Sequence, residues 1–263
     1  MGEDAPVVAD TTGPVTTVTL NRPERLNAIS PAVVDAIDAA LDGLTASTRV
    51  LVITGRGRAF SAGGDLEAVE AMARERGLGA GAGTEEFHAA ISAVLRRLEL
   101  LDFPVVAAVN GLAVAGGLEI ACACDVVLAV ESARFGDGHA NYGLLPAGGG
   151  SVRLPRRLGV GRAKYLMYTG ETVSAATMRD WGLVAELVGD GELAAATDRL
   201  TARLAAASRD GLGRMKTMVD RGLEMTVDDA LAHEQKVAAE HVHAADYAEG
   251  LSAFRERRAP RFD

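Results

Sequence analysis

The sequence predicts an α/β fold followed by a helical C-terminal region. Over the first half of the chain, short apolar segments alternate with longer segments of helical periodicity, which is the order of a mixed α/β protein. From Pro146 onward the pattern is mostly helical. The 263 residues allow between one and two domains of about 150 residues. Since no convincing linker interrupts them, we expect one core over residues 1–195 and a helical appendage over residues 196–263.

The first elements follow from local signals. Residues 7–9 and 15–20 are expected to be strands of a hairpin, because Gly13-Pro14 lies between them. Ser30 is a typical N-cap, and Pro31 is favoured at the first helical position. This pair predicts a helix over residues 31–46.

Glycine-rich segments separate the next elements. A buried strand is expected over residues 49–54, and it ends at the glycine-rich residues 55–65. A helix follows Asp65. The sequence GLGAGAG over residues 77–83 predicts a mobile loop, after which a helix runs from Thr84 to about Leu101.

The later elements are expected from apolar segments and helical periodicity. Strands are predicted over residues 105–110, 126–130, 133–135 and 183–188. Helices are predicted over residues 118–124 and, as one long charged helix, over residues 227–258.

Composition limits the class of function. The formal net charge is −9 and only 4% of the residues are aromatic, which disfavours a nucleic-acid-binding surface. Glycine supplies 30 residues, against a usual fraction of about 7%, and this excess is typical of tight turns and close backbone approaches. A small-molecule enzyme is therefore the first expectation.

The chain is expected to be cytoplasmic and not membrane-bound. Asn110, Glu119 and Asp125 interrupt the most apolar region at intervals too short for a membrane span. The acidic N-terminus lacks the basic and apolar parts of a signal peptide. Cys122 and Cys124 are poorly spaced for a disulfide, so we expect buried thiols in a reducing compartment.

Two segments share a strand, a glycine pair and a helix start. They are residues 55–66 and residues 109–125. Free backbone N–H groups at two helix N-termini can point at one oxygen, which is the geometry of an oxyanion hole. Glu119 lies among apolar residues, where desolvation raises a carboxyl pKa toward the range of a general acid or base. The alternatives are a turn capped by Asp65 and a structural ion pair at Glu119.

A third segment, residues 134–159, contains His139, Tyr142 and a glycine triplet. A single histidine is more often a core or surface residue than a catalytic one. Tyr142 is close enough in sequence to orient His139 or to line a pocket.

These residues resemble the crotonase (enoyl-CoA hydratase/isomerase) superfamily over nearly the whole chain. The shared motifs, in family order, are NRP at 21–23, AFSAGGDL at 59–66, VNG at 109–111, AGGLE at 115–119, CD at 124–125, FG at 135–136 and PAGGG at 146–150. The chain end, with Glu249-Gly250, Ala253-Phe254, Arg258, Pro260 and Phe262, is similar to the family as well.

The resemblance implies a crotonase-like spiral of repeated ββα turns, with C-terminal helices that build a homotrimer or a homohexamer made of two trimers. It implies an acyl-CoA thioester as substrate. We expect no other cofactor and no nucleic-acid or membrane partner, and no metal, because His88, His233, His241 and His243 have no metal-ligand partners at usable spacing. The backbone N–H groups of Gly64 and Gly116 would form the oxyanion hole. The implied CoA-binding residues are Arg22, Arg25, Ala62, Asp65 and Leu66.

The family's hydratases use two glutamates, and this chain departs from that pattern. The first matches Glu119, whereas the second position, 20 residues later, is His139. The preferred interpretation is an enoyl-CoA hydratase in which Glu119 and His139 act as the acid/base pair, because imidazole exchanges protons near neutral pH. The alternatives are an enoyl-CoA isomerase, an acyl-CoA or C–C hydrolase that uses the same pair, and a non-catalytic acyl-CoA-binding paralogue.

Overall fold

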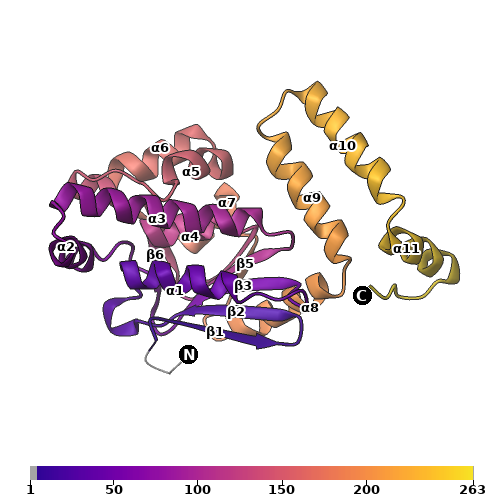
Figure 1. Cartoon of the computed structure of the whole chain (residues 1–263), viewed down its shortest axis with the longest axis horizontal. Helices are drawn as coiled ribbons and strands as arrows, with labels where there is room; N and C mark the ends of the chain where they lie inside the picture. Colours follow the sequence, from indigo (N-terminus) through magenta and orange to yellow (C-terminus); the bar gives the residue numbers. More distant parts are fainter. Residues whose placement is uncertain (1–4, 263) are drawn as a thin grey trace.

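Two β-sheets and the helices around them make up the computed structural model, which describes residues 5–262 (Figure 1). The larger sheet has the strand order β1-β2-β3-β5-β7-β10. Its strands are β1 (Val7–Thr12), β2 (Val15–Leu20), β3 (Val50–Gly55), β5 (Val105–Val109), β7 (Val126–Val130) and β10 (Glu186–Val188). The α/β prediction is confirmed, and so is the hairpin, since β1 and β2 pair antiparallel.

A smaller sheet, absent from the sequence prediction except for one strand, has the order β4-β6-β8-β9. Its strands are β4 (Ala59–Ser61), β6 (Leu112–Val114), β8 (Arg134–Gly136) and β9 (Thr172–Ser174). Each has only three residues, too few to establish a period of two in the sequence.

Successive strands alternate between the sheets and produce the ββα repeat. β3, β5 and β7 are parallel neighbours in the larger sheet, and β4, β6 and β8 are parallel neighbours in the smaller one. Helices α2 (Leu66–Glu75), α4 (Gly116–Ala123) and α5 (Gly150–Leu158) follow β4, β6 and β8 along the chain. Because parallel strands end at the same edge of a sheet, the segments after β4, β6 and β8 converge there.

Side-chain caps begin two of the helices where the sequence predicts. Ser30 accepts a hydrogen bond from the N–H of Val33 at the start of α1 (Pro31–Asp42), which ends four residues earlier than expected. Asp65 accepts one from the N–H of Ala68 at the start of α2. Each cap satisfies an N–H group that the helix leaves unpaired.

The prediction of a loop over residues 77–83 is wrong from residue 80 onward. Helix α3 (Ala80–Leu100) begins inside it, before Thr84. The reason is packing between helices: a Cβ on Gly83 would overlap Ala73 of α2. Gly83 therefore permits a close approach between α2 and α3, and burial outweighs its low helix propensity.

The single helix expected over residues 227–258 is also wrong. The structure has α10 (Val227–His241) and α11 (Ala245–Glu256), with a break between them. Asp246, in the first turn of α11, is hydrogen-bonded to Ser208, the N-cap of α9 (Arg209–Gly222), so the chain must turn there. In Figure 1, α9 and α10 form a hairpin beside the sheet layers, with α11 beyond it.

The predicted division between residues 195 and 196 falls within α8 (Leu193–Ala205). Leu200 and Leu204 of α8 pack against the larger sheet. The remaining elements are η1 (Pro23–Arg25), η2 (His139–Tyr142), α6 (Val160–Thr169) and α7 (Ala175–Trp181).

The core lies between the sheets and their helices, and its largest side chains include Phe60 and Phe135 of the smaller sheet. Both are fully buried, so the short strands that lead to the converging segments are firmly anchored. Over residues 5–262, no helix is long and apolar enough to cross a membrane.

Candidate active site

A cavity of about 700 Å³ opens where the segments after β4, β6 and β8 converge. Gly64, Gly116, Glu119 and His139 all line it, so the structure brings together the four residues that sequence analysis singled out for catalysis. Thr84, Phe87, His88 and Ile91 of α3 form another part of the wall. The remaining walls are largely apolar, with Ile29, Leu66, Leu112, Val114, Leu144 and Leu145 among their side chains.

The backbones of the two glycine segments lie against each other. A Cβ on Gly116 would be 3.7 Å from the Cα of Gly63, which places the N-terminus of α4 beside the segment that precedes α2. No described residue accepts a hydrogen bond from the N–H of Gly64 or of Gly116. Two unpaired donors therefore border one cavity.

Ala115, at the N-cap of α4, has a strained backbone. Its φ of 49° and ψ of −117° lie in a region that residues with a Cβ rarely adopt. Such strain costs about 1–3 kcal/mol and clusters at functional sites. Here it turns the chain from β6 into α4, whose first residue, Gly116, lines the cavity.

Glu119 is a buried carboxyl in the first turn of α4, with 4% of its surface exposed. Its Oε1 accepts a hydrogen bond of 2.8 Å from the N–H of Gly150. Burial raises the pKa of this carboxyl above its usual value, although the Gly150 N–H and the charge of His139 act in the opposite direction. Glu119 therefore exchanges a proton closer to neutral pH than an exposed glutamate does.

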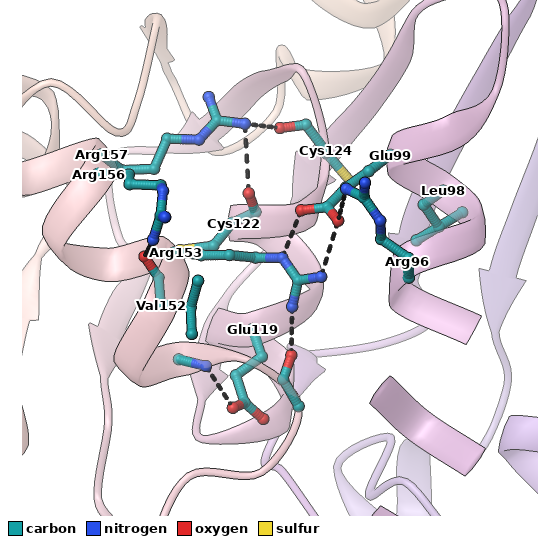
Figure 2. Close-up of polar contacts among 12 residues, drawn as sticks. Arg96, Leu98, Glu99, Glu119, Cys122, Cys124, Val152, Arg153, Arg156 and Arg157 are labelled. Atoms are coloured by element: carbon teal, nitrogen blue, oxygen red, sulfur yellow. Dashed lines mark hydrogen bonds and ion pairs between the residues drawn. The ribbon is translucent and has the colours of Figure 1, made fainter. Parts of the chain in front are cut away.

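An arginine holds the glycine triplet on Glu119 (Figure 2). Arg153 of α5 forms a two-pronged ion pair with Glu99 of α3, with nitrogen–oxygen distances of 2.5 and 2.9 Å, and also donates to the carbonyl of Gly148. A Cβ on Gly148 would overlap Oε2 of Glu119. The ion pair thus fixes the segment that packs directly on the carboxylate.

His139 begins η2 and is bound by an aspartate two residues before it. Its Nδ1 lies 2.9 Å from Oδ1 of Asp137, a carboxylate that is only 1% exposed. Burial alone lowers the pKa of the imidazole, but the hydrogen bond and charge of Asp137, together with the charge of Glu119, raise it above the usual value. The protonated form of the His139 ring is therefore more favoured than that of a free histidine.

The residues predicted to bind CoA fall into two groups. Ala62 and Leu66 line the cavity. Arg22 and Asp65 instead bind each other at 2.8 Å, and Arg22 also donates to the carbonyl of Ala28. Arg25 is exposed and pairs with Glu67 at 3.3 Å. A role of these three charged residues in binding CoA stays a prediction.

Sequence analysis missed Asp137, His88 and the pair of Arg153 and Glu99. The only sequence signal for Asp137 is its place two residues before His139. In the structure, Gly138 between them has a φ of 72°. Tyr142, expected to orient His139 or to line a pocket, lines the cavity at 82% exposure, and the residue that binds His139 is Asp137. The ion pair of Arg153 and Glu99 joins residues 54 positions apart, so no local sequence pattern predicts it.

Two further expectations concern thiols and metals. Cys122 and Cys124 are free and buried, as predicted. Among residues 5–262, no group of three or more His, Cys, Asp or Glu side chains is placed to hold a metal ion.

Comparison with known proteins agrees with the resemblance in the sequence. The family described as enoyl-CoA hydratase/isomerase matches residues 10–263. A short-chain-enoyl-CoA hydratase of Clostridium acetobutylicum is 33% identical, over 96% of this chain and 95% of that protein. A 1,2-epoxyphenylacetyl-CoA isomerase of Escherichia coli is 35% identical, over 94% of each chain.

A solved structure extends the likeness to the fold. The crystal structure of an enoyl-CoA hydratase from Bacillus anthracis has a TM-score of 0.91 and 32% sequence identity, and the match covers 98% of both chains. The expected ββα spiral with helices at its C-terminal end is thereby confirmed.

Proposed function

Because the chain belongs to the enoyl-CoA hydratase/isomerase family, we propose that it adds water reversibly to the double bond of a 2-enoyl-CoA thioester. The observation that carries the proposal is one cavity lined by a carboxyl and an imidazole, Glu119 and His139, together with the unpaired N–H groups of Gly64 and Gly116. This arrangement supplies an acid/base pair and two donors for a developing negative charge.

The two glycine N–H groups bind the oxygen of the thioester carbonyl. Attack on the double bond moves an electron pair onto this oxygen and gives an enolate, whose charge the donors stabilise. One donor of this kind contributes on the order of 10²–10³ in rate. Glycine suits the position of Gly64, because a side chain would extend toward Phe87 and Leu66, which also line the cavity.

Glu119 acts as the base toward water. Its Oε1 is held by Gly150, whereas no described residue donates a hydrogen bond to Oε2. Oε2 is therefore free to accept the proton of a water molecule while the water oxygen bonds to Cβ of the acyl group. Burial strengthens this base relative to an exposed carboxylate.

His139 completes the addition as the acid. The Nε2–H bond of the imidazolium breaks as its proton moves to Cα, and the enolate collapses to the saturated thioester. The site then holds a protonated Glu119 and a neutral His139, and transfer of one proton between them restores the starting state. The sum of these steps is the addition of one water molecule, with no other reactant.

The test is a panel of 2-enoyl-CoA thioesters of different length, with loss of the conjugated double bond as the readout. We expect turnover by the natural chain and a loss of roughly 10³-fold or more in Glu119→Gln. Glu131→Gln, which changes an exposed glutamate immediately after β7, is the matched control and should retain full activity.

Three other results would overturn the hydratase assignment. Conversion of 3-enoyl-CoA alone would indicate an isomerase, the second activity in the description of the family. Consumption of acyl-CoA or β-keto thioesters alone would indicate a hydrolase. Binding of acyl-CoA without any conversion would indicate a non-catalytic paralogue.

We also propose a cytoplasmic homotrimer or homohexamer. The support for assembly is a set of exposed apolar side chains in the C-terminal region, namely Met215, Val219, Leu223, Val227 and Leu231. A monomeric mass in sedimentation at micromolar concentration would contradict the assembly.

A further inference from the structure

We propose that Asp137 is a positioning residue that binds the Nδ1–H of His139 and so presents Nε2 to the acyl group as the proton donor. The inference rests on the proposed function, because the transferred proton belongs to that reaction. Its structural basis is independent of the substrate: Asp137 follows β8 directly, and its carboxylate is fully enclosed by the protein.

The contact between the two residues fixes the ring in two ways. Oδ1 of Asp137 lies 2.9 Å from Nδ1 of His139 and accepts a second hydrogen bond, of 3.3 Å, from the backbone N–H of the same residue. A carboxylate that accepts from Nδ1 requires the proton on that nitrogen. Nε2 then remains, and no described residue forms a hydrogen bond with it.

The charges around the ring favour the imidazolium. Asp137 faces it from its own segment, and Glu119 faces it from α4. His88 of α3 also interacts with it, and burial and the charge of His139 lower the pKa of His88, which disfavours a second positive charge beside the ring. Arg153 of α5 acts on Glu119 and is neutralised by its own partner, Glu99.

A purely structural role for Asp137 would have a different signature. In Asp137→Asn, the amide oxygen can still accept the hydrogen bond from the backbone N–H of His139, so the local fold is retained. The amide oxygen also still accepts from Nδ1–H, but the negative charge that stabilises the imidazolium is lost, so more of His139 is neutral at a given pH. A neutral ring that keeps its proton on Nδ1 has none on Nε2 and cannot act as the acid.

The first test is the pH dependence of kcat and KM for 2-enoyl-CoA hydration. In Asp137→Asn we expect kcat to fall roughly 10²-fold with KM nearly unchanged, and the alkaline limb of kcat to move to lower pH. Asp210→Asn is the matched control, because Asp210 binds the half-buried His241 at 3.1 Å, outside the cavity. This control should follow the natural chain.

An unchanged kcat and alkaline limb in Asp137→Asn would overturn the inference. A loss of kcat with an unmoved limb would also overturn it, because that is the result of a structural role alone.

The second test needs no turnover. Nitrogen NMR of the natural chain distinguishes the five histidines, and the resonance lost in His139→Gln identifies His139. We expect its proton on Nδ1 in the neutral form and a titration midpoint above that of a free histidine. A proton on Nε2, or a midpoint at or below the ordinary value, would overturn the role of Asp137 even in an active hydratase.

The two tests separate the inference from the proposed function. The chain could hydrate no 2-enoyl-CoA and yet show a raised titration midpoint of His139 that falls in Asp137→Asn. That result would support the interaction of Asp137 with His139 and overturn the hydratase assignment. Hydration of 2-enoyl-CoA with an ordinary titration midpoint for His139 would support the hydratase assignment and overturn the role of Asp137.

Discussion

The backbone N–H of Gly150 donates a 2.8 Å hydrogen bond to Oε1 of Glu119, and so the first residue of α5 holds the carboxylate carried by α4. The same interaction divides the carboxylate into a bound oxygen and a free one. The position of the free oxygen therefore depends on the glycine segment at residues 148–150, and substitutions in that segment test the account.

Gly148→Ala should strongly lower the kcat of hydration with little loss of acyl-CoA binding. The new methyl group would overlap Oε2 of Glu119, so the carboxylate must move out of position. A displacement of this size costs on the order of 10²-fold in kcat. Steady-state kinetics check the loss, and Gly161→Ala in α6 is the control, because a Cβ there meets no atom within 4 Å. Equal activities of the two variants would contradict the prediction.

Arg153→Gln should lower both stability and activity. It leaves the half-buried Glu99 with the exposed Arg96 as its remaining partner and frees the carbonyl of Gly148. Because the pair is partly exposed, we expect the free energy of unfolding to fall by about 1–3 kcal/mol, with a loss of kcat of roughly 10-fold. Urea unfolding measures the first effect, and Arg156→Gln, on an exposed arginine of the same helix, is the control.

The double variant Glu99→Gln with Arg153→Gln supplies a second check. Removing both charges leaves no unpaired buried ion, so its loss of stability should be smaller than the sum of the single losses. Strictly additive losses would indicate that the two residues act independently.

The pH dependence of stability should reflect the raised pKa values of Glu119 and His139. Both pKa values lie above the ordinary 4.5 and 6.5, so the native state binds more protons than the unfolded state across that range. The stability from His139 is present below its unfolded pKa and is lost as the pH rises through its folded pKa, and ionisation of Glu119 lowers stability in the same direction.

Denaturant unfolding at about pH 5 and about pH 8 checks this, with Glu119→Gln/His139→Gln as reference. Between these pH values, the free energy of unfolding should fall more for the natural chain than for the reference, because only the natural chain carries the two groups whose pKa values are raised in the native state. Parallel pH profiles for the two chains would show that neither group titrates as described.

The two thiols should resist alkylation in the folded chain. Burial raises the pKa of Cys122 to about 12 and also raises that of Cys124, so neither forms the reactive thiolate near neutral pH. Mass spectrometry after iodoacetamide treatment should find both unmodified, with labelling only at the rate of unfolding. Rapid labelling with full activity would contradict this burial.

Local signals were sufficient for several parts of the fold. Ser30 with Pro31, and Asp65, begin helices at the expected positions because capping is a short-range interaction. The smaller sheet could not be predicted in the same way, because its short strands are stabilised by neighbours distant in sequence. The prediction of a loop at Gly83 failed for the same reason, since the close approach of Gly83 to Ala73 exists only after two helices pack.

In the active site, too, the sequence predicted some residues and not others. Gly64, Gly116, Glu119 and His139 could be proposed from motif and spacing, and the structure gathers them at one cavity. The partners that hold them could not be proposed, because Glu99 meets Arg153 only when α3 and α5 pack together. Motifs thus identify the groups that react, whereas the fold determines what orients them.

The central claim is that Glu119 directs water to Cβ of a 2-enoyl-CoA thioester. The most direct measurement is mass spectrometry of the product formed in water labelled with heavy oxygen, for the natural chain and for Glu119→Gln. We predict a 3-hydroxyacyl-CoA that carries the label at the new hydroxyl, formed by the natural chain and absent with the variant. Label in a free carboxylate, or an unlabelled product with a shifted double bond, would contradict the account.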